Sequence, residues 1–330
     1  MILTKLAQAT CPNRQKSVAL ILAVTLNFLC SSWGFQAHRE INQIAVYGLP
    51  PELFGFYRDH LDYLAEHAVS ADMRRYIDTA EGARHYLDVD FYEGSFPLDT
   101  VRCSWDSIQA RYGSDVVQKH GVLPWNLIRN YQLLKWAFRQ HDADAVLRLS
   151  ADIGHYVGDL HVPLHTTANY NGQLSNQHGI HGLWETRLVE LQAFGYDLLV
   201  DTASFIPNVP EFIWQRLEES ARMVDSVLML EQRITYEVGE ENKFQFDTRK
   251  SAVSRQYSQL FCEHYHRALN HMVERRMQSA IHAVRCLWMS AWVEAGQPDM
   301  HQFEYSPAAP ARFSMDSLVR FGRMLGRDEH

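Results

Sequence analysis

Apolar residues recur at steps of three and four along two long stretches of the chain. The first series is Leu127, Tyr131, Leu134 and Phe138, and the second is Tyr257, Phe261, Tyr265, Ala268 and Met272. Such spacing gathers the side chains on one face of an α-helix. No segment of strand length shows sustained alternation of apolar and polar residues. The pattern predicts an all-α fold, a single-domain multi-helix bundle.

The sequence pattern also predicts the other helices and the loops. Further helices are predicted over residues 37–48, 51–66, 143–161, 183–194, 210–232 and 252–294. Loops are predicted over residues 67–84, 90–103, 166–180 and 233–249. Three prolines between residues 296 and 310 indicate a break, so we expect a helical domain at 33–295 and a C-terminal extension at 296–330.

The first 32 residues read as a targeting segment. Basic residues precede an uncharged apolar run over residues 18–30, and small residues follow it up to Trp33. The run is too short for an ordinary membrane-spanning helix and is typical of a secretory signal peptide. We expect cleavage before Trp33, a secreted or periplasmic mature protein, and no transmembrane segment after cleavage.

Composition limits the chemistry in two ways. The chain carries 31 basic and 39 acidic residues, and the predicted mature part has 28 and 39, a net charge of −11. That balance argues against a broad basic face for duplex DNA. The mature part keeps Cys103, Cys262 and Cys286, which allow at most one disulfide and form no C-x-x-C zinc or redox motif. The 17 histidines are the unusual feature.

Histidines and carboxylates occur at metal-ligand spacing in two motifs. In the first, His155 and Asp159 are four residues apart on a predicted helix, so their side chains leave the same face. Pro163 disfavours helical geometry at the preceding residue, which lets His165 turn back toward the same site. In the second motif, His181 and Glu185 repeat the four-residue pair. Ligands of this kind without cysteine suit zinc.

These motifs resemble those of the superfamily that contains the zinc-dependent bacterial phospholipases C and the single-strand-specific zinc nucleases. The resemblance covers about residues 33–190 and implies a trinuclear zinc site at the bottom of a cleft. In that family the mature chain begins with a tryptophan whose amine and carbonyl bind zinc, as cleavage before Trp33 would allow.

The resemblance also implies the ligand sets. The first zinc would be bound by Asp72, His85, His155 and Asp159. The second would be bound by His165, His181 and Glu185, and the third by Trp33, His38 and Asp159, with Asp159 bridging two metals.

The implied reaction is attack on phosphorus by a water or hydroxide held between two zinc ions. Asp72, Arg75 and Asp159 would be the catalytic residues, and Arg75 would bind a phosphate oxygen. Tyr86 and Asp88 correspond to substrate-binding positions, since a nuclease aspartate at the second position contacts the base.

Two branches of the family and one other class remain open. The spacings around His38, Arg75 and Asp88 favour nuclease-type action on single-stranded nucleic acid or nucleotides. Glu185 favours the alternative, a phospholipase C that cleaves phospholipid head groups, because the nucleases favour aspartate there. The third hypothesis is a non-catalytic binding module stabilised by zinc. We expect a phosphoester substrate and no stable protein partner.

Overall fold

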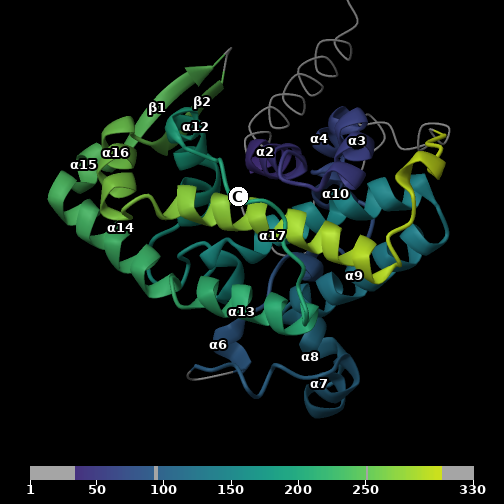
Figure 1. Cartoon of the computed structure of the whole chain (residues 1–330). Coiled ribbons are helices and arrows are strands. Elements are labelled where there is room, and N and C mark those ends of the chain that lie inside the picture. Colours follow the sequence, from purple (N-terminus) through teal and green to yellow (C-terminus); the bar gives the residue numbers. More distant parts are fainter. Residues whose placement is uncertain (1–33, 93–95, 250–251, 307–330) are drawn as a thin grey trace, which may run out of the picture.

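The computed structural model describes residues 34–92, 96–249 and 252–306 (Figure 1). Its α-helices are α2 (Gly34–Val46), α3 (Pro51–Asp59), α4 (Leu61–His67), α5 (Ser70–Arg74), α6 (Val89–Tyr92), α7 (Trp105–Tyr112), α8 (Ser114–Lys119), α9 (Leu123–Arg139), α10 (Ala143–Leu160), α11 (Ile180–Gly182), α12 (Leu188–Gln192), α13 (Val209–Ala221), α14 (Val224–Val238), α15 (Glu240–Lys243), α16 (Gln259–Ala268) and α17 (Met272–Glu294). Short helical turns are η1 (Gly82–His85), η2 (Pro163–Thr166), η4 (Ala193–Gly195), η5 (Met300–Gln302) and the π-helical turn η3 (Leu183–Arg187), and the strands are β1 (Phe244–Arg249) and β2 (Ala252–Tyr257). The predicted all-α class is confirmed.

The main hydrophobic core lies between α2, α9, α10 and α17. The predicted apolar face of α9 is confirmed, because Leu127, Tyr131, Leu134 and Phe138 are all buried. Helix α10 packs against α9 along its length, and α17 crosses both of them and contacts α2 (Figure 1). Asp142 begins α10 by accepting a hydrogen bond from the Ala145 amide at 2.9 Å, which satisfies a donor at the helix start.

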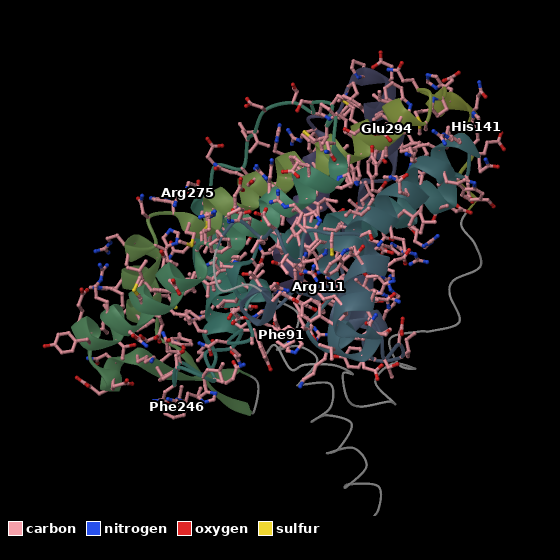
Figure 2. All side chains as sticks on the ribbon, turned by 90° about the horizontal axis from the view of Figure 1, so that it is seen from below. Phe91, Arg111, His141, Phe246, Arg275 and Glu294 are labelled. Atoms are coloured by element: carbon pink, nitrogen blue, oxygen red, sulfur yellow. The ribbon has the colours of Figure 1, made fainter. Side chains whose placement is uncertain are left out.

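A second hydrophobic cluster joins the 162–189 segment to α14, α16 and the beginning of α17. Its buried members include Leu164, Trp184, Phe261 and Tyr265. Figure 2 shows Phe246 and Arg275 near this end of the molecule, and His141 and Glu294 at the other end. The protein therefore has two apolar cores along one elongated body.

The hairpin of β1 and β2 corrects the prediction that no segment forms strands. The strands pair antiparallel with Phe244 opposite Tyr257. The predicted loop at 233–249 is also wrong, since α14 continues to Val238 and β1 begins at Phe244. Gly239, with φ of 86°, ends α14 in a conformation that favours glycine.

The single helix predicted over 252–294 is likewise wrong. It begins as strand β2 and is interrupted between α16 and α17, where Asn270 and His271 have φ of 49° and 58°. Two successive left-handed residues cannot continue a right-handed helix. The apolar series survives the break because Phe261, Tyr265 and Met272 still face one core.

Other predictions concern residues near or beyond the two ends of the described part of the chain. The proposed signal segment 1–32 and Trp33 lie outside the described residues, as do residues 307–330. From the predicted extension, Phe303 packs on the rings of Phe56 and Phe138. Cys103, Cys262 and Cys286 are free thiols. None of the described helices combines the length and the apolar character needed to cross a bilayer.

Candidate metal centre

Helix α10 carries the central pair of the site. His155 and Asp159 lie one turn apart, and both are buried, with exposures of 0% and 1%. The distance from His155 Nε2 to Asp159 Oδ2 is 3.3 Å. The four-residue spacing thus places an imidazole and a carboxylate side by side on the inner face of the helix.

A first ligand group forms around this pair. His85, at the end of η1, places Nδ1 3.0 Å from Asp159 Oδ2 and 3.1 Å from His155 Nε2. Asp72, on α5, places Oδ1 3.8 Å from the same nitrogens of His85 and His155. The structure therefore brings together the four residues that the resemblance assigns to the first zinc.

A second group gathers His165, His181 and Glu185. The Glu185 Oε2 atom lies 2.8 Å from His181 Nε2 and 3.5 Å from His165 Nε2. His165 follows Pro163 in η2, so the chain turns after α10 as predicted. Glu185 stands on the π-helical turn, a kind of distortion that occurs often at functional sites.

His38, on α2, connects the two groups. Its Nε2 atom is 3.5 Å from Asp159 Oδ1 and 3.5 Å from Glu185 Oε1. Its ring stacks on that of His155 with centroids 4.2 Å apart. The three residues His38, Asp159 and Glu185 hold their ligand atoms within 4.8 Å of one another. Trp33, the other ligand assigned to this third position, lies outside the described residues.

Main-chain carbonyl groups orient three of the imidazoles. His155 Nδ1 lies 2.8 Å from the Ala68 oxygen, His165 Nδ1 lies 2.6 Å from the His85 oxygen, and His181 Nδ1 lies 3.3 Å from the Tyr170 oxygen. Because a carbonyl oxygen only accepts, each Nδ1 carries the proton, which directs the lone pair of the neutral ring's Nε2 into the site.

The carboxylates and histidines of the site shift one another's pKa values. Although burial alone would raise it, the pKa of Asp159 is held well below its usual range by His155 and His165. Burial alone would lower the pKa of His155, but the negative charges of Asp159 and Asp72 outweigh burial and raise this pKa to about 9. The pKa of Glu185 is lowered against its burial by hydrogen bonds from His165 and His181. The carboxylates therefore stabilise the protonated, positively charged form of His155.

The donor set fits divalent metal ions. Nitrogen and carboxylate-oxygen donors converge in groups of three within 4.8 Å, and no thiol belongs to any group. This is a donor set of zinc and related metals. His38 Nδ1 is buried and has no hydrogen-bond partner among the described residues.

A buried ion network behind His85 was missed by sequence reasoning. Glu81, fully buried, binds Arg74, Arg84 and the Tyr156 hydroxyl, and its Oε1 lies 3.7 Å from His85 Nε2. These contacts lower the pKa of Glu81 although burial opposes the shift. A signal was present, since Glu81 and His85 repeat the four-residue carboxylate–histidine spacing.

The predicted substrate residues occupy buried positions beside the ligands. Arg75 is 1% exposed, with Nη1 4.0 Å from Asp72 Oδ1, so it is not a surface arginine. Asp88 pairs with His120, whose Nδ1 is 3.1 Å from Asp88 Oδ2. Tyr86 donates a hydrogen bond to the Lys119 carbonyl. Substrate binding by these three residues stays a prediction.

Fold and site together define a helical protein with buried groups of histidine and carboxylate side chains that could hold metal ions. Its sequence is similar to Nuclease S1 from Aspergillus oryzae, with 24% identity over 187 residues. The match covers 52% of this chain and 60% of the length of the nuclease. No protein-family model matches the chain. The nuclease match supports the predicted resemblance, at the level of the superfamily of S1–P1 nucleases and zinc-dependent phospholipases C.

Proposed function

We propose that the chain is a secreted, zinc-dependent phosphoester hydrolase of the nuclease type. The observation that carries this proposal is the convergence of three ligand groups on Asp159, His38 and Glu185, in a chain similar to Nuclease S1. A closed structural zinc site needs only four protein ligands. A site of eight described donor residues exceeds that need and suits several ions.

The proposed occupancy follows the three groups. Asp72, His85, His155 and Asp159 would bind one zinc ion. His165, His181 and Glu185 would bind a second, and His38, Asp159 and Trp33 a third. Zinc supplies Lewis-acid chemistry, because it lowers the pKa of bound water and neutralises phosphoryl oxygens.

The chain's own residues would position the reactants. The side chains of Asp72 and Glu185 are 19% and 13% exposed, while the histidine ligands are buried. A phosphoester would therefore approach along the side marked by these two carboxylates. The Arg75 guanidinium lies beside Asp72 and would add fixed positive charge where phosphate charge develops.

The first test is a panel of substrates given to the zinc-loaded protein: single-stranded DNA, RNA, nucleoside monophosphates and phosphatidylcholine vesicles. We expect cleavage of single-stranded nucleic acid. Hydrolysis of phosphatidylcholine alone would instead establish the phospholipase C alternative, which Glu185 favours as a ligand. No hydrolysis, with one fully protein-ligated zinc, would establish the binding module.

A substitution at the shared ligand tests the metal assignment. Asp159→Ala should lower the zinc content, measured by mass spectrometry of the metal, and reduce hydrolysis by at least about 100-fold, because two ligand groups lose a member. Asp144→Ala, on the first turn of the same helix, is the control and should keep both. Full turnover by the Asp159 variant would refute the proposal.

A further inference from the structure

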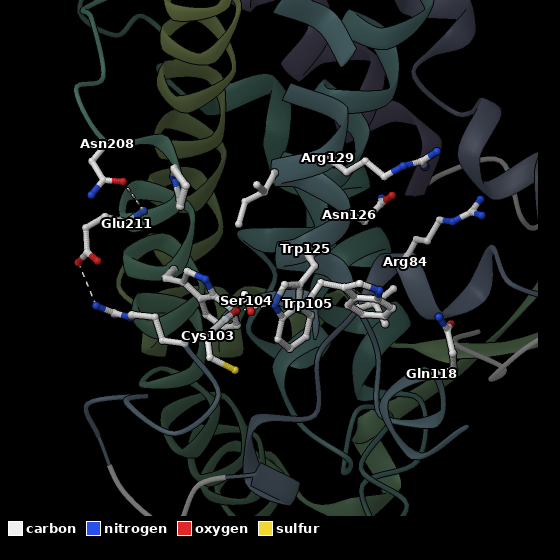
Figure 3. A pocket seen from close by; sticks show the side chains of 15 residues that line it. Arg84, Cys103, Ser104, Trp105, Gln118, Trp125, Asn126, Arg129, Asn208 and Glu211 are labelled. Carbon is white, nitrogen blue, oxygen red and sulfur yellow. Dashed lines mark hydrogen bonds and ion pairs between the residues drawn. The ribbon is translucent and has the colours of Figure 1, made fainter. Parts of the chain in front are cut away.

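A second site candidate lies apart from the ligands, in a cavity of about 840 Å³ between α7, α9 and α13 (Figure 3). This volume falls in the range of small-molecule sites. Arg84 lines it and directly precedes the ligand His85. The beginning of α9 is hydrogen-bonded to the same segment, through Val122 N to Ala83 O at 2.7 Å. The cavity thus adjoins the backbone that carries a metal ligand.

Three tryptophans belong to the apolar lining of the cavity. Trp105 and Trp125 have ring centroids 5.8 Å apart, and those of Trp125 and Trp214 are 5.2 Å apart. Trp125 is fixed by a hydrogen bond from Nε1 to the Cys103 carbonyl at 2.8 Å. Trp105 is only half-buried. Trp125 and Trp214 are buried, so the aromatic surface open to a flat ligand is that of Trp105, which packs against Trp125.

Unused donors lie beside these rings. Asn126 is 8% exposed and lines the cavity, and its Nδ2 atom has no hydrogen-bond partner in the described part of the chain. Its Oδ1 atom is occupied by Asn130. Arg129, one turn further along α9, is exposed and forms no ion pair within the described ranges. Figure 3 shows Asn126, Arg129 and Arg84 on one side of the cavity.

On the opposite side of the cavity, the positive charge of an arginine is already paired with carboxylates of the protein. Arg102 is bound by Glu211 at 2.9 Å and by Glu218 at 3.1 Å. Both Arg102 and Glu211 line the cavity, and Figure 3 shows Glu211 on the side away from Arg129. Asn126 Nδ2 and the Arg129 guanidinium, on the other side, are two groups that a ligand could engage. A ligand that matches these groups and the tryptophan has an aromatic ring, an acceptor on the ring edge and a negative charge.

We propose that this cavity is a second nucleotide-binding site, which holds one nucleotide of a single strand. The base packs on Trp105, an acceptor on its edge takes the hydrogen bond of Asn126 Nδ2, and a phosphate lies at Arg129. Every base has an aromatic face, so such a site tolerates sequence. The choice of a nucleotide rests on the proposed nuclease function.

Binding is tested on the full-length, zinc-loaded protein with a fluorescent, hydrolysis-resistant phosphorothioate oligonucleotide. Trp105→Ala and Arg129→Glu should each raise the dissociation constant by roughly 10-fold, as measured by fluorescence polarisation. The matched controls are Trp136→Ala and Arg148→Glu, which change exposed residues of α9 and α10 away from the cavity. Equal dissociation constants for all four variants and the unaltered protein would overturn the proposal.

A second readout needs no substitution. Cys103 lines the cavity, whereas Cys262 and Cys286 are buried elsewhere. The oligonucleotide should slow alkylation of Cys103 by N-ethylmaleimide several-fold, as followed by peptide mass spectrometry, with the two buried cysteines as internal references. Alkylation of Cys103 at an unchanged rate with saturating oligonucleotide would also overturn the proposal.

The two proposals can fail separately. Hydrolysis of thymidine 5′-(p-nitrophenyl phosphate), a single-nucleotide ester, reports on the metal centre of the unaltered protein. If this ester and the substrate panel are not hydrolysed, the proposed function is refuted, while polarisation and alkylation still decide whether the cavity binds a nucleotide. If the ester is hydrolysed and neither cavity readout responds, only the second site is refuted.

Discussion

At the scale of single residues, the candidate ligands differ in how directly the sequence predicted them. His155 with Asp159, and His181 with Glu185, could be predicted from helical spacing, because four residues return a side chain to the same face. Asp72 and His85 stand on separate short elements, α5 and η1, with no periodic relation to α10. Only the family resemblance indicated them, since local spacing carries no information about contacts between distant segments.

Glu81 offers a test of the network behind the ligands. Glu81→Gln should weaken binding of the zinc ion that we propose at His85 by about 10-fold to 100-fold, because the carboxylate beside Nε2 increases the basicity of the ring. It should also lower the free energy of unfolding by about 2 kcal/mol, since Arg74 and Arg84 lose a charged partner. Calorimetric zinc titration and urea unfolding measure the two effects.

The control for this experiment is Glu66→Gln, which alters an exposed carboxylate on α4. It should change neither quantity. If Glu81→Gln lowered stability but left zinc affinity intact, Glu81 would serve the fold alone.

At the scale of elements, the sequence predicted where helices lie better than where they end. The prediction of 143–161 matches α10, but the predicted helix 51–66 is divided at His60 into α3 and α4. His60 has φ of −119° and ψ of 24°, outside the helical region. Periodicity continues across such a break when both helices face one core, so the pattern alone does not mark it.

The hairpin was missed for a related reason. Strand β1 does alternate, with Phe244 and Phe246 two residues apart, but it is only six residues long. Phe246 is 75% exposed, so the apolar face of the strand is not wholly buried. A short strand with an exposed aromatic residue lacks the contrast between inner and outer faces that predicts a strand.

The start of α10 provides a test at this scale. Asp142→Ala should lower the free energy of unfolding by about 1 kcal/mol, because the Ala145 amide loses its acceptor. The melting temperature should fall by about 2–4 °C. Zinc content should be unchanged, since His155 lies more than three turns away along the helix. Asp142→Asn keeps a capping oxygen and is the matched control; an equal loss in both variants would contradict the capping role.

At the scale of the whole molecule, the candidate metal centre lies where the two hydrophobic cores meet. Helix α10, with His155 and Asp159, belongs to the larger core, while Leu164, Ile180 and Leu183, which adjoin the second ligand group, belong to the smaller one. Ions bound there would link the two cores. Metal binding to the folded state alone adds to its stability by mass action.

The pH dependence of that stabilisation can be predicted with its sign. In the metal-free protein the pKa of His155 is raised to about 9, so its protonated form stabilises the fold fully below its ordinary value near 6.5. This contribution is lost as the pH rises through 9. Zinc requires neutral imidazole, so its affinity increases over the same interval.

The melting temperature of the zinc-loaded protein should therefore exceed that of the chelated protein by a margin that widens between pH 6.5 and 9. Differential scanning calorimetry at several pH values measures this margin. The Asp159→Ala variant should lack the widening. A margin that stays constant, or narrows, would show that protons and metal do not compete for these histidines.

The carbonyl groups that orient His155, His165 and His181 have a consequence for how this site changes over time. A main-chain oxygen is not encoded by any particular codon, so mutation at Ala68 or Tyr170 leaves the acceptor in place as long as the backbone path is kept. Many surrounding residues can then be substituted without changing the orientation of the imidazole rings. A lineage can lose most of its recognisable identity and still inherit the same centre.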